Sequence, residues 1–296
     1  MRLSVVIPSY NSAKTIERCL GSLAGAPLET EIIVVDSSSD GAAGIVRDRF
    51  PHVRLIHFEQ RMYPGDARNA GAAVASGDVL AFLDADTAVA PDWALEVARA
   101  HRGKYAAVGG SLLNANPNSL VGWAHYLFEF SAWLPYGVDH EQAEIPGGCW
   151  SITREAFARY GPFPERTYSE DSVLSWRIRA AGERLLFAPA IRVSHVNRED
   201  VWGLLRDKCR HGRDLAAQRM VFSRVLYALG TPAIPFMLVG RIAKRVWPHP
   251  ALRSRLWRTC PLIALLTVFW SIGELRGYLA RPKRLAHEAR RGSDLG

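Results

Sequence analysis

Two aspartates, Asp84 and Asp86, follow an apolar run and are well placed in this chain to hold a metal ion. The run, residues 79–83 (VLAFL), has the length and composition of a buried β-strand. Both carboxylates therefore leave the predicted sheet together, and hard cations such as Mg²⁺ and Mn²⁺ bind carboxylate oxygens. A solvated turn that caps a following helix is the alternative, because two acidic residues at this spacing are common in loops.

Polar residues also end the predicted strands at 3–7 and 31–35. The first strand leads into Pro8, Tyr10 and Asn11, and the second leads into Asp36. Further strands are predicted at 53–58 and 79–83, and helices are predicted between the strands at 13–23, 40–50 and 66–76. This alternation predicts an α/β fold with a Rossmann-like, mostly parallel sheet and helices on both faces. Ligands of such sheets bind beyond the carboxyl ends of the strands, so these polar residues are expected along one rim.

Composition places the chain among globular proteins in a reducing compartment. Of its 296 residues, 48% are hydrophobic and 22% are charged. Four scattered cysteines without a CxxC pair argue against a zinc site or a disulfide framework. Because a predicted strand begins at Leu3, we expect no signal peptide and a cytosolic N-terminal part.

The basic charge is concentrated in the last third of the chain. Residues 199–296 hold 18 Lys and Arg against seven Asp and Glu, whereas the whole chain has a net charge of +8. Apolar runs at 225–240 and 259–273 separate the basic residues, which favours an anionic membrane surface over nucleic acid as the partner. Both runs are short for spanning, so we expect interfacial or re-entrant helices on the cytoplasmic face of the cell membrane. A soluble helical extension that packs on the core or on a second subunit is the alternative.

An ordered set of motifs resembles the family-2 glycosyltransferases, which have the GT-A nucleotide-diphospho-sugar transferase fold. The motifs are VVIPSYN (5–11), IIVVDSSSD (32–40), GDARNAGAAVASGDVLAFLDADT (65–87), GGCWSITREAF (147–157), YSEDSVLSWRIRAAG (168–182) and SHV (194–196). The resemblance covers residues 1 to about 220, and FWSIGELRGYL at 269–279 is similar to the tail of bacterial membrane-associated members. It implies a GT-A catalytic domain at 1–222, with nucleotide-binding (1–104) and acceptor (105–222) halves. A membrane-associating helical region at 223–296 would follow.

The resemblance implies a metal-bound nucleotide-diphosphate sugar as the donor, with Mn²⁺ or Mg²⁺ as cofactor. Asp86 would ligate the metal directly, and Asp84 would contact the ribose or reach the metal through water. His195 would complete the coordination or touch the diphosphate, unless it is a buried structural histidine.

Residues at the strand ends and at the start of the third helix are candidates for binding the nucleotide. Asp36 would accept from the base or the ribose, while Pro8, Tyr10 and Asn11 flank the base and Tyr10 offers a stacking face. The cluster at 37–40 can also act only as a helix N-cap.

Three further residues are candidates for contacting the nucleotide-sugar donor. Two lie near the third helix, and one lies in the basic helix predicted at 200–222. Asp66 would contact the base and Arg68 the loop or a phosphate, with helix capping and an ordinary ion pair as the alternatives. Arg210 would clamp the diphosphate together with its neighbours at helical spacing, and a solvated basic helix is its alternative.

Catalysis is assigned by the resemblance to Asp171, at the start of a predicted helix. An inverting transfer needs one base to take the proton from the acceptor hydroxyl. Glu170 would orient a neighbour or the acceptor, and Gly148 and Trp150 would line the acceptor side, although Trp150 can equally pack in the core. The absence of a QxxRW motif favours single addition to a glycan or lipid-linked acceptor.

Two other classes of protein are weighed against a glycosyltransferase. A catalytically inactive nucleotide-sugar-binding protein at the membrane would be free to lose some of Asp84, Asp86, Asp171 and His195, yet all four are present. A nucleotidyltransferase predicts a glycine-rich sequence after the first strand, and IPSYNSAKT has none.

Overall fold

The computed structural model describes residues 1–25, 29–219 and 221–280. The chain forms two compact units, the first comprising Met1–Glu199 and the second beginning at Asp200. Helix α8 (Val201–Gln218) packs along helix α11 (Pro250–Leu279) inside the second unit. The catalytic-domain boundary at residue 222 stays a prediction, because the two units are defined by packing alone.

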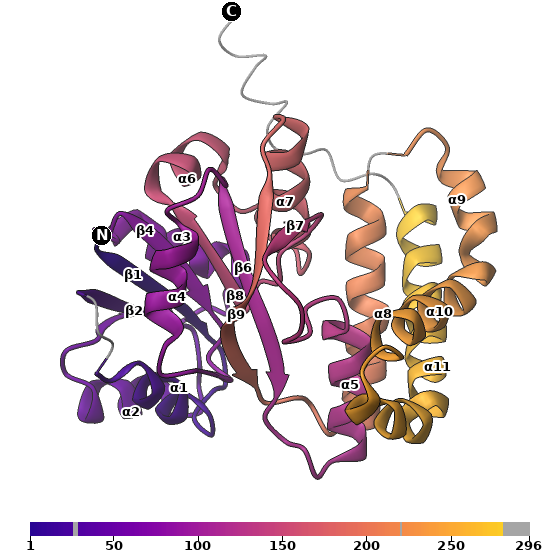
Figure 1. Ribbon diagram of the computed structural model, residues 1–296, viewed down its shortest axis with the longest axis horizontal. Coiled ribbons are helices and arrows are strands. Elements are labelled where there is room, and N and C mark those ends of the chain that lie inside the picture. The colour runs from indigo at the N-terminus through magenta and orange to yellow at the C-terminus, as the bar shows by residue number, and fades with distance from the viewer. Residues whose placement is uncertain (26–28, 220, 281–296) are drawn as a thin grey trace, which may run out of the picture. The chain divides into compact units, whose positions relative to one another are not determined.

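The first unit is built on a mixed sheet (Figure 1), described in the order β3-β2-β1-β4-β8-β6-β9-β5, with β7 paired to β9. The strands are β1 (Leu3–Ser9), β2 (Thr30–Asp36), β3 (Arg54–His57), β4 (Val79–Leu83), β5 (Thr87–Val89), β6 (Ala107–Asn114), β7 (His140–Gln142), β8 (Cys149–Thr153) and β9 (Leu185–His195). The four strands predicted from the first 83 residues are present and pair in parallel. The predicted α/β architecture is confirmed, and the mostly parallel pairing that was predicted for the sheet holds for these four strands.

The second half of the sheet is mainly antiparallel. Strand β8 runs antiparallel to both of its neighbours, β4 and β6, and β5 runs antiparallel to β9. Strand β9 is continuous through Pro189, and its parallel pairing with β6 shifts register beside this residue. Proline has no N–H to donate, so the ladder is interrupted there without ending the strand.

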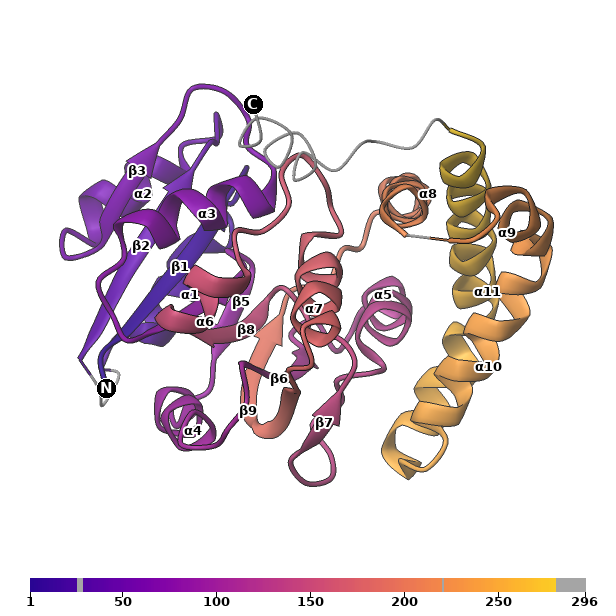
Figure 2. The same cartoon turned by 90° about the horizontal axis from the view of Figure 1, so that it is seen from above.

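Two layers of helices cover the sheet (Figure 2). On one face lie α1 (Ile16–Leu23), α2 (Ala42–Arg49) and α4 (Trp93–Ala100); on the other lie α3 (Pro64–Val74), α6 (Arg154–Tyr160) and α7 (Glu170–Ala180). Neighbouring residues of β1 point into different cores, since Val5 packs with the first layer and Val6 with the second. The sheet is therefore buried on both faces, and polar side chains gather at its rim.

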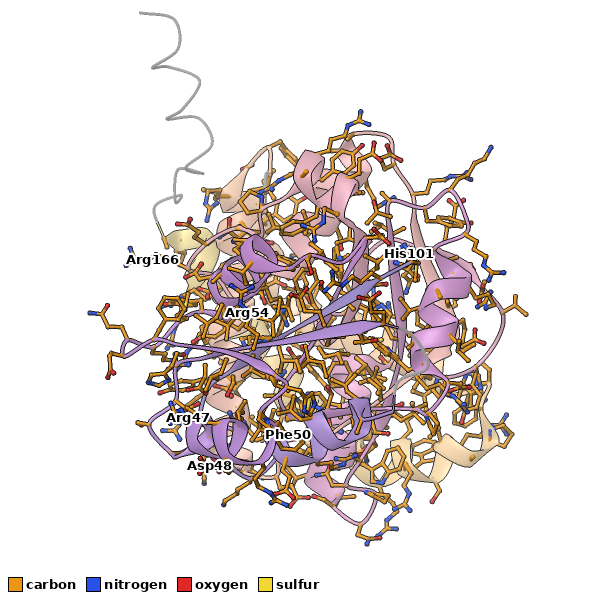
Figure 3. The ribbon with its side chains drawn as sticks, turned by 90° about the vertical axis from the view of Figure 1, so that its left-hand side faces the viewer. Arg47, Asp48, Phe50, Arg54, His101 and Arg166 are labelled. Atoms are coloured by element: carbon orange, nitrogen blue, oxygen red, sulfur yellow. The ribbon has the colours of Figure 1, made fainter. Side chains whose placement is uncertain are left out.

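Helix α2 has one side buried on the sheet and one side in solvent. Ala42 and Val46 are buried against the sheet, four residues apart on one face. Arg47 and Asp48 lie on the solvent side of the helix (Figure 3). The apolar stripe that predicted this helix is thus the stripe that docks it.

The second unit consists of helices. After α8 come α9 (Arg224–Gly230), the 3₁₀ turn η1 (Thr231–Ala233), α10 (Ile234–Val246) and α11. Glycines allow α8 and α11 to touch, since a Cβ at Gly273 would lie 2.1 Å from the carbonyl oxygen of Cys209. Buried Glu274 accepts hydrogen bonds from Arg219 at 2.8 Å and from the Tyr278 hydroxyl at 3.0 Å. Close backbone contact and a satisfied polar network hold these helices together.

Two segments of the second unit are long and apolar enough to cross a membrane by length and composition. They are Arg224–Val246 and Pro250–Leu279, and in their most apolar windows only 17% and 33% of the residues are buried. Large apolar side chains are exposed there, among them Phe236 at 82% and Trp257 at 67%. This unit therefore presents more apolar surface than its own packing requires.

Candidate active site

Asp84, Asp86 and His195 come together where β4 ends and β5 pairs with β9. A turn follows β4, in which the Thr87 N–H and hydroxyl donate to the Asp84 carbonyl at 3.1 and 2.7 Å. The antiparallel register places His195 opposite Thr87, and the Val196 N–H donates to the Asp86 carbonyl at 3.0 Å. One ligand atom from each of the three side chains lies within 4.8 Å of the others. Backbone pairing therefore builds the trio that was predicted to hold a metal.

The donor atoms of this trio suit a divalent cation. Among the described residues, the buried Asp86 Oδ1 and His195 Nδ1 have no hydrogen-bond partner. His195 Nε2 is 3.5 Å from Asp86 Oδ1. Loss of solvent raises the pKa of Asp86, with His195 opposing the rise and Asp84 adding to it. A cation would offset the repulsion between the carboxylates, and two carboxylates favour Mg²⁺ or Mn²⁺.

Arg68 connects the two acidic parts of the site. It lies in the first turns of α3, is 2% exposed, and donates through Nη2 to Asp84 Oδ1 at 2.6 Å. Its Nη1 pairs with Glu170 at the start of α7. Burial opposes the charge of Arg68, but Asp84 and Glu170 outweigh it and raise the pKa. Arg68 therefore orients Asp84 and neutralises Glu170.

The two carboxyls that begin α7 have different surroundings. Glu170 is 5% exposed and bound to Arg68, so it is a positioning residue rather than an acceptor contact. Asp171 accepts from the Gly147 N–H at 2.9 Å and from the Ser172 N–H at 2.7 Å. Burial and then the neighbouring Glu170 raise the pKa of Asp171 to about 7. A carboxyl with a pKa near neutrality suits a general base.

Gly148 and Trp150 share a strand end but face different surroundings. Because Cys149 pairs with Leu83, Gly148 lies beside Asp84, and a Cβ there would be 2.5 Å from Asp84 Oδ2. Trp150 is 2% exposed and packs on Phe163 in the core, so it presents no face to a sugar. The acceptor role expected of Trp150 is therefore corrected to core packing.

Asp36 is the most enclosed of the predicted binding residues. Its carboxylate is buried and accepts from the hydroxyls of Ser9 and Ser38 at 2.6 Å each and from the Ser38 N–H at 3.1 Å. The His57 Nδ1 atom lies 2.8 Å from its other oxygen. Burial raises the pKa of Asp36, but the hydrogen bonds from Ser38, Ser9 and His57 outweigh it and lower the pKa overall.

The residues after β1 flank this network. Pro8 is still within β1, opposite Val35, whereas Asn11 has a left-handed φ of 52° and donates its N–H to Ser38 at 2.8 Å. Tyr10 is 43% exposed, and the guanidinium of Arg61 lies 4.2 Å from its ring centroid. The face of Tyr10 predicted to stack on a base is thus paired with a cation in this structure.

Asp66 and Arg210 lie in different surroundings from the rest. Asp66 accepts from the Arg166 N–H at 3.2 Å, and partial burial raises its pKa. It supports the loop before α7, whereas α3 begins without a side-chain cap hydrogen bond, and the contact of Asp66 with a base stays a prediction. Arg210 lies on α8 in the second unit, 3.9 Å from Asp207, and its contact with a diphosphate stays a prediction.

His57 was absent from the sequence predictions, whereas Ser9, Ser38 and Gly147 lay within the predicted strand ends and motifs, without the hydrogen bonds that they make here to Asp36 and Asp171. His57 is the last residue of β3, so the same rule that selected the ends of the neighbouring strands would have found it. Gly147 acts only through its N–H, and a backbone donor leaves no mark on residue type.

A family model described as Glycosyl transferase family 2 matches residues 4–161, more than half of the chain. The chain therefore belongs to this family.

Relatives and a solved structure agree with this assignment. The succinoglycan biosynthesis protein ExoO of Rhizobium meliloti is 42% identical over 93 residues, covering 30% of this chain and 27% of that protein. A pre-mycofactocin glycosyltransferase of Mycobacterium tuberculosis is 29% identical over 230 residues, covering 72% of this chain and 47% of that protein. The mannosyltransferase PcManGT of Pyrobaculum calidifontis, solved with GDP-Man and Mn²⁺, has a TM-score of 0.57 and 20% identity, covering 99% of this chain and 80% of that one. The fold is thus that of the GT-A glycosyltransferases, and the chain spans less than half the length of the two curated relatives.

Proposed function

We propose that this protein is an inverting, metal-dependent glycosyltransferase that moves a sugar from a nucleotide-diphosphate donor to an acceptor hydroxyl. The observation that carries the proposal is the arrangement around Arg68. This one buried cation binds Asp84 of the metal trio and Glu170, the neighbour of the candidate base Asp171. A donor held at the trio would therefore have a base of suitable pKa close by.

The proposed reaction is a single displacement. Asp171 accepts the proton of the acceptor hydroxyl as its oxygen bonds to the anomeric carbon. The bond from that carbon to the diphosphate breaks on the opposite face, and the nucleoside diphosphate leaves with the electron pair. Asp84, Asp86 and His195 would hold the Mn²⁺ or Mg²⁺, which as a Lewis acid offsets charge on the leaving group. One base suffices because the diphosphate needs no proton to depart.

We further propose single addition to a glycan or a lipid-linked acceptor. No QxxRW motif of processive synthases occurs in the sequence. A catalytically inactive nucleotide-sugar-binding protein is the alternative, and it differs by binding a donor without turning it over.

The test is sugar transfer from UDP-, GDP- and dTDP-sugars, with Mn²⁺ or Mg²⁺ and with EDTA. We expect turnover of one donor class, lowered by EDTA by about 100-fold or more because the cation contributes several kcal/mol to stabilising the leaving group. Added Mn²⁺ should restore the rate. Binding of nucleotide without transfer supports the inactive alternative, and undiminished turnover in EDTA contradicts the metal.

The second unit is proposed to attach the enzyme to the cytoplasmic face of the cell membrane. Support comes from the exposed apolar side chains of α9–α11 together with the nearby basic residues Arg241, Lys244 and Arg245. Apolar side chains enter the interface while cations meet anionic headgroups. Such attachment would bring the site to a membrane-delivered acceptor.

Sedimentation with vesicles containing anionic phosphatidylglycerol tests this attachment. The full chain carrying Leu229→Asp and Phe236→Asp, at positions 72% and 82% exposed, should bind at least about tenfold more weakly, since burying each apolar side chain contributes about 1.5–3 kcal/mol. Leu95→Asp, at a position of α4 that is 49% exposed, is the matched control and should bind like the unchanged protein. Equal sedimentation of all three proteins would contradict membrane attachment through this surface.

A further inference from the structure

The parallel strands β1, β2 and β3 (Figure 2) each end in a polar residue. The register pairs Ser9 with Asp36 and Asp36 with His57. Ligands of parallel sheets bind beyond this edge. The row of these three residues is therefore the natural place for the base of a bound nucleotide, and the remaining question is which side chain can receive it.

Asp36 cannot receive a ligand without giving up an existing bond. It is 0% exposed, and both of its oxygens are already occupied by Ser9, Ser38 and His57. A carboxylate offers about four acceptor sites, and these are used by the four bonds observed. Asp36 therefore positions the side chains around it, and a bound base would contact one of these side chains rather than Asp36.

His57 is the neighbour that combines exposure with a fixed orientation. Its side chain is 31% exposed, and Nδ1 lies 2.8 Å from the fully buried Asp36. An ionised carboxylate only accepts, so Nδ1 carries the proton in this contact, and in the neutral ring Nε2 then carries a lone pair. Asp36 therefore sets the tautomer of His57, as carboxylates do for metal-ligating histidines.

Resting on the function proposed above, we propose that His57 Nε2 selects the base of the donor by accepting a hydrogen bond from a ring N–H. Uracil, thymine and guanine carry such an N–H next to a carbonyl. Cytosine and adenine present a ring nitrogen lone pair at the matching edge, and two facing acceptors leave both unpaired. A site built on a hydrogen bond discriminates against the partner that lacks it. His57 thereby limits the donor to UDP-, dTDP- or GDP-linked sugars.

Binding of UDP, dTDP, GDP, CDP and ADP in the presence of Mn²⁺, measured by calorimetry on the full chain, tests the assignment. The unchanged protein should bind its preferred nucleotide about tenfold more tightly than CDP and ADP. This factor corresponds to gaining one hydrogen bond instead of leaving two acceptors unpaired. His57→Ala should lose this preference and bind CDP as before, while His57→Gln, which keeps an acceptor, should recover part of it. His52→Ala is the matched control, since His52 is an exposed histidine in the turn before β3, and it should behave like the unchanged protein.

Nucleotides methylated at the ring nitrogen separate direct contact from a structural role. The diphosphates of 3-methyluridine or 1-methylguanosine should bind the unchanged protein about tenfold more weakly than their parents and bind His57→Ala equally well. A purely structural role would weaken parent and methylated nucleotides alike. Equal discrimination by His57→Ala, or a preference for CDP or ADP, overturns the inference while leaving the proposed function intact. Failure of the folded protein to bind any of the five nucleotides overturns both.

Discussion

Asp171→Asn is expected to lower the rate of sugar transfer by about 10²–10⁴-fold, the usual contribution of a positioned general base. Asparagine has nearly the same shape, but its one side-chain oxygen can accept from only one of the Gly147 and Ser172 N–H groups, which bond to different oxygens of Asp171. The site should therefore keep its overall shape, while it loses the proton acceptor and one of these two hydrogen bonds. Transfer kinetics and nucleoside diphosphate binding, measured on the same preparation, check the result, and binding should change by less than about threefold.

The pH dependence of the unchanged protein provides a second measure of the same residue. Burial and Glu170 raise the pKa of Asp171 to about 7, so its carboxyl is protonated and inactive as a base below that pH. The value of kcat/KM should rise as pH increases through about 7 and then level off, because this parameter reports the free enzyme. In Asp171→Asn the residual rate should lack this step. Retention of full activity in this variant would exclude Asp171 as the base.

Arg68→Met is expected to destabilise the first unit by about 3–5 kcal/mol, because it leaves the buried Glu170 carboxylate without its cation. Methionine keeps much of the volume, so the loss comes mainly from charge. Thermal unfolding followed by circular dichroism should show a midpoint lower by about 6–20 °C.

The double variant Arg68→Met with Glu170→Gln separates charge from packing. Removing the buried negative charge of Glu170 should recover part of the stability that Arg68→Met loses. Donor binding should stay impaired in both the single and the double variant. Arg177→Met is the matched control: Arg177 is partly buried, and within the described part of the chain its guanidinium donates to the carbonyl oxygens of Tyr160 and Pro162 rather than to a carboxylate. If Arg68→Met costs no more than this control, the ion pair does not hold the site together.

Local sequence patterns were sufficient for the N-terminal half of the fold. The runs at 79–83 and 3–7 form strands because they are short and mostly apolar, and the helices between them show apolar residues at a period of 3.6. Alternation of the two elements then requires a parallel sheet. Polar residues after each strand fall on one rim for the same reason, which is why residue order and type were enough to select Asp84 and Asp86.

Pairing between distant segments could not be read in this way. The pairings of β8 and β9 depend on which strand edge is free after the first four strands have paired, and that is a global property. Trp150 illustrates the consequence: its residue type suits either a sugar platform or a core, and packing against Phe163 decides for the core. Strand β9 continued past Pro189 because its pairing partner tolerates a register shift.

The sequence by itself determined the class of fold, the family and the side chains able to do chemistry, because these follow from local periodicity and residue type. Tertiary structure alone decided their roles. It enclosed Asp36 in four hydrogen bonds, joined Asp84 to Glu170 through Arg68, and raised the pKa of Asp171 towards neutrality. Burial and the charges of neighbours distant in the chain set these properties, and both exist only once the chain has folded.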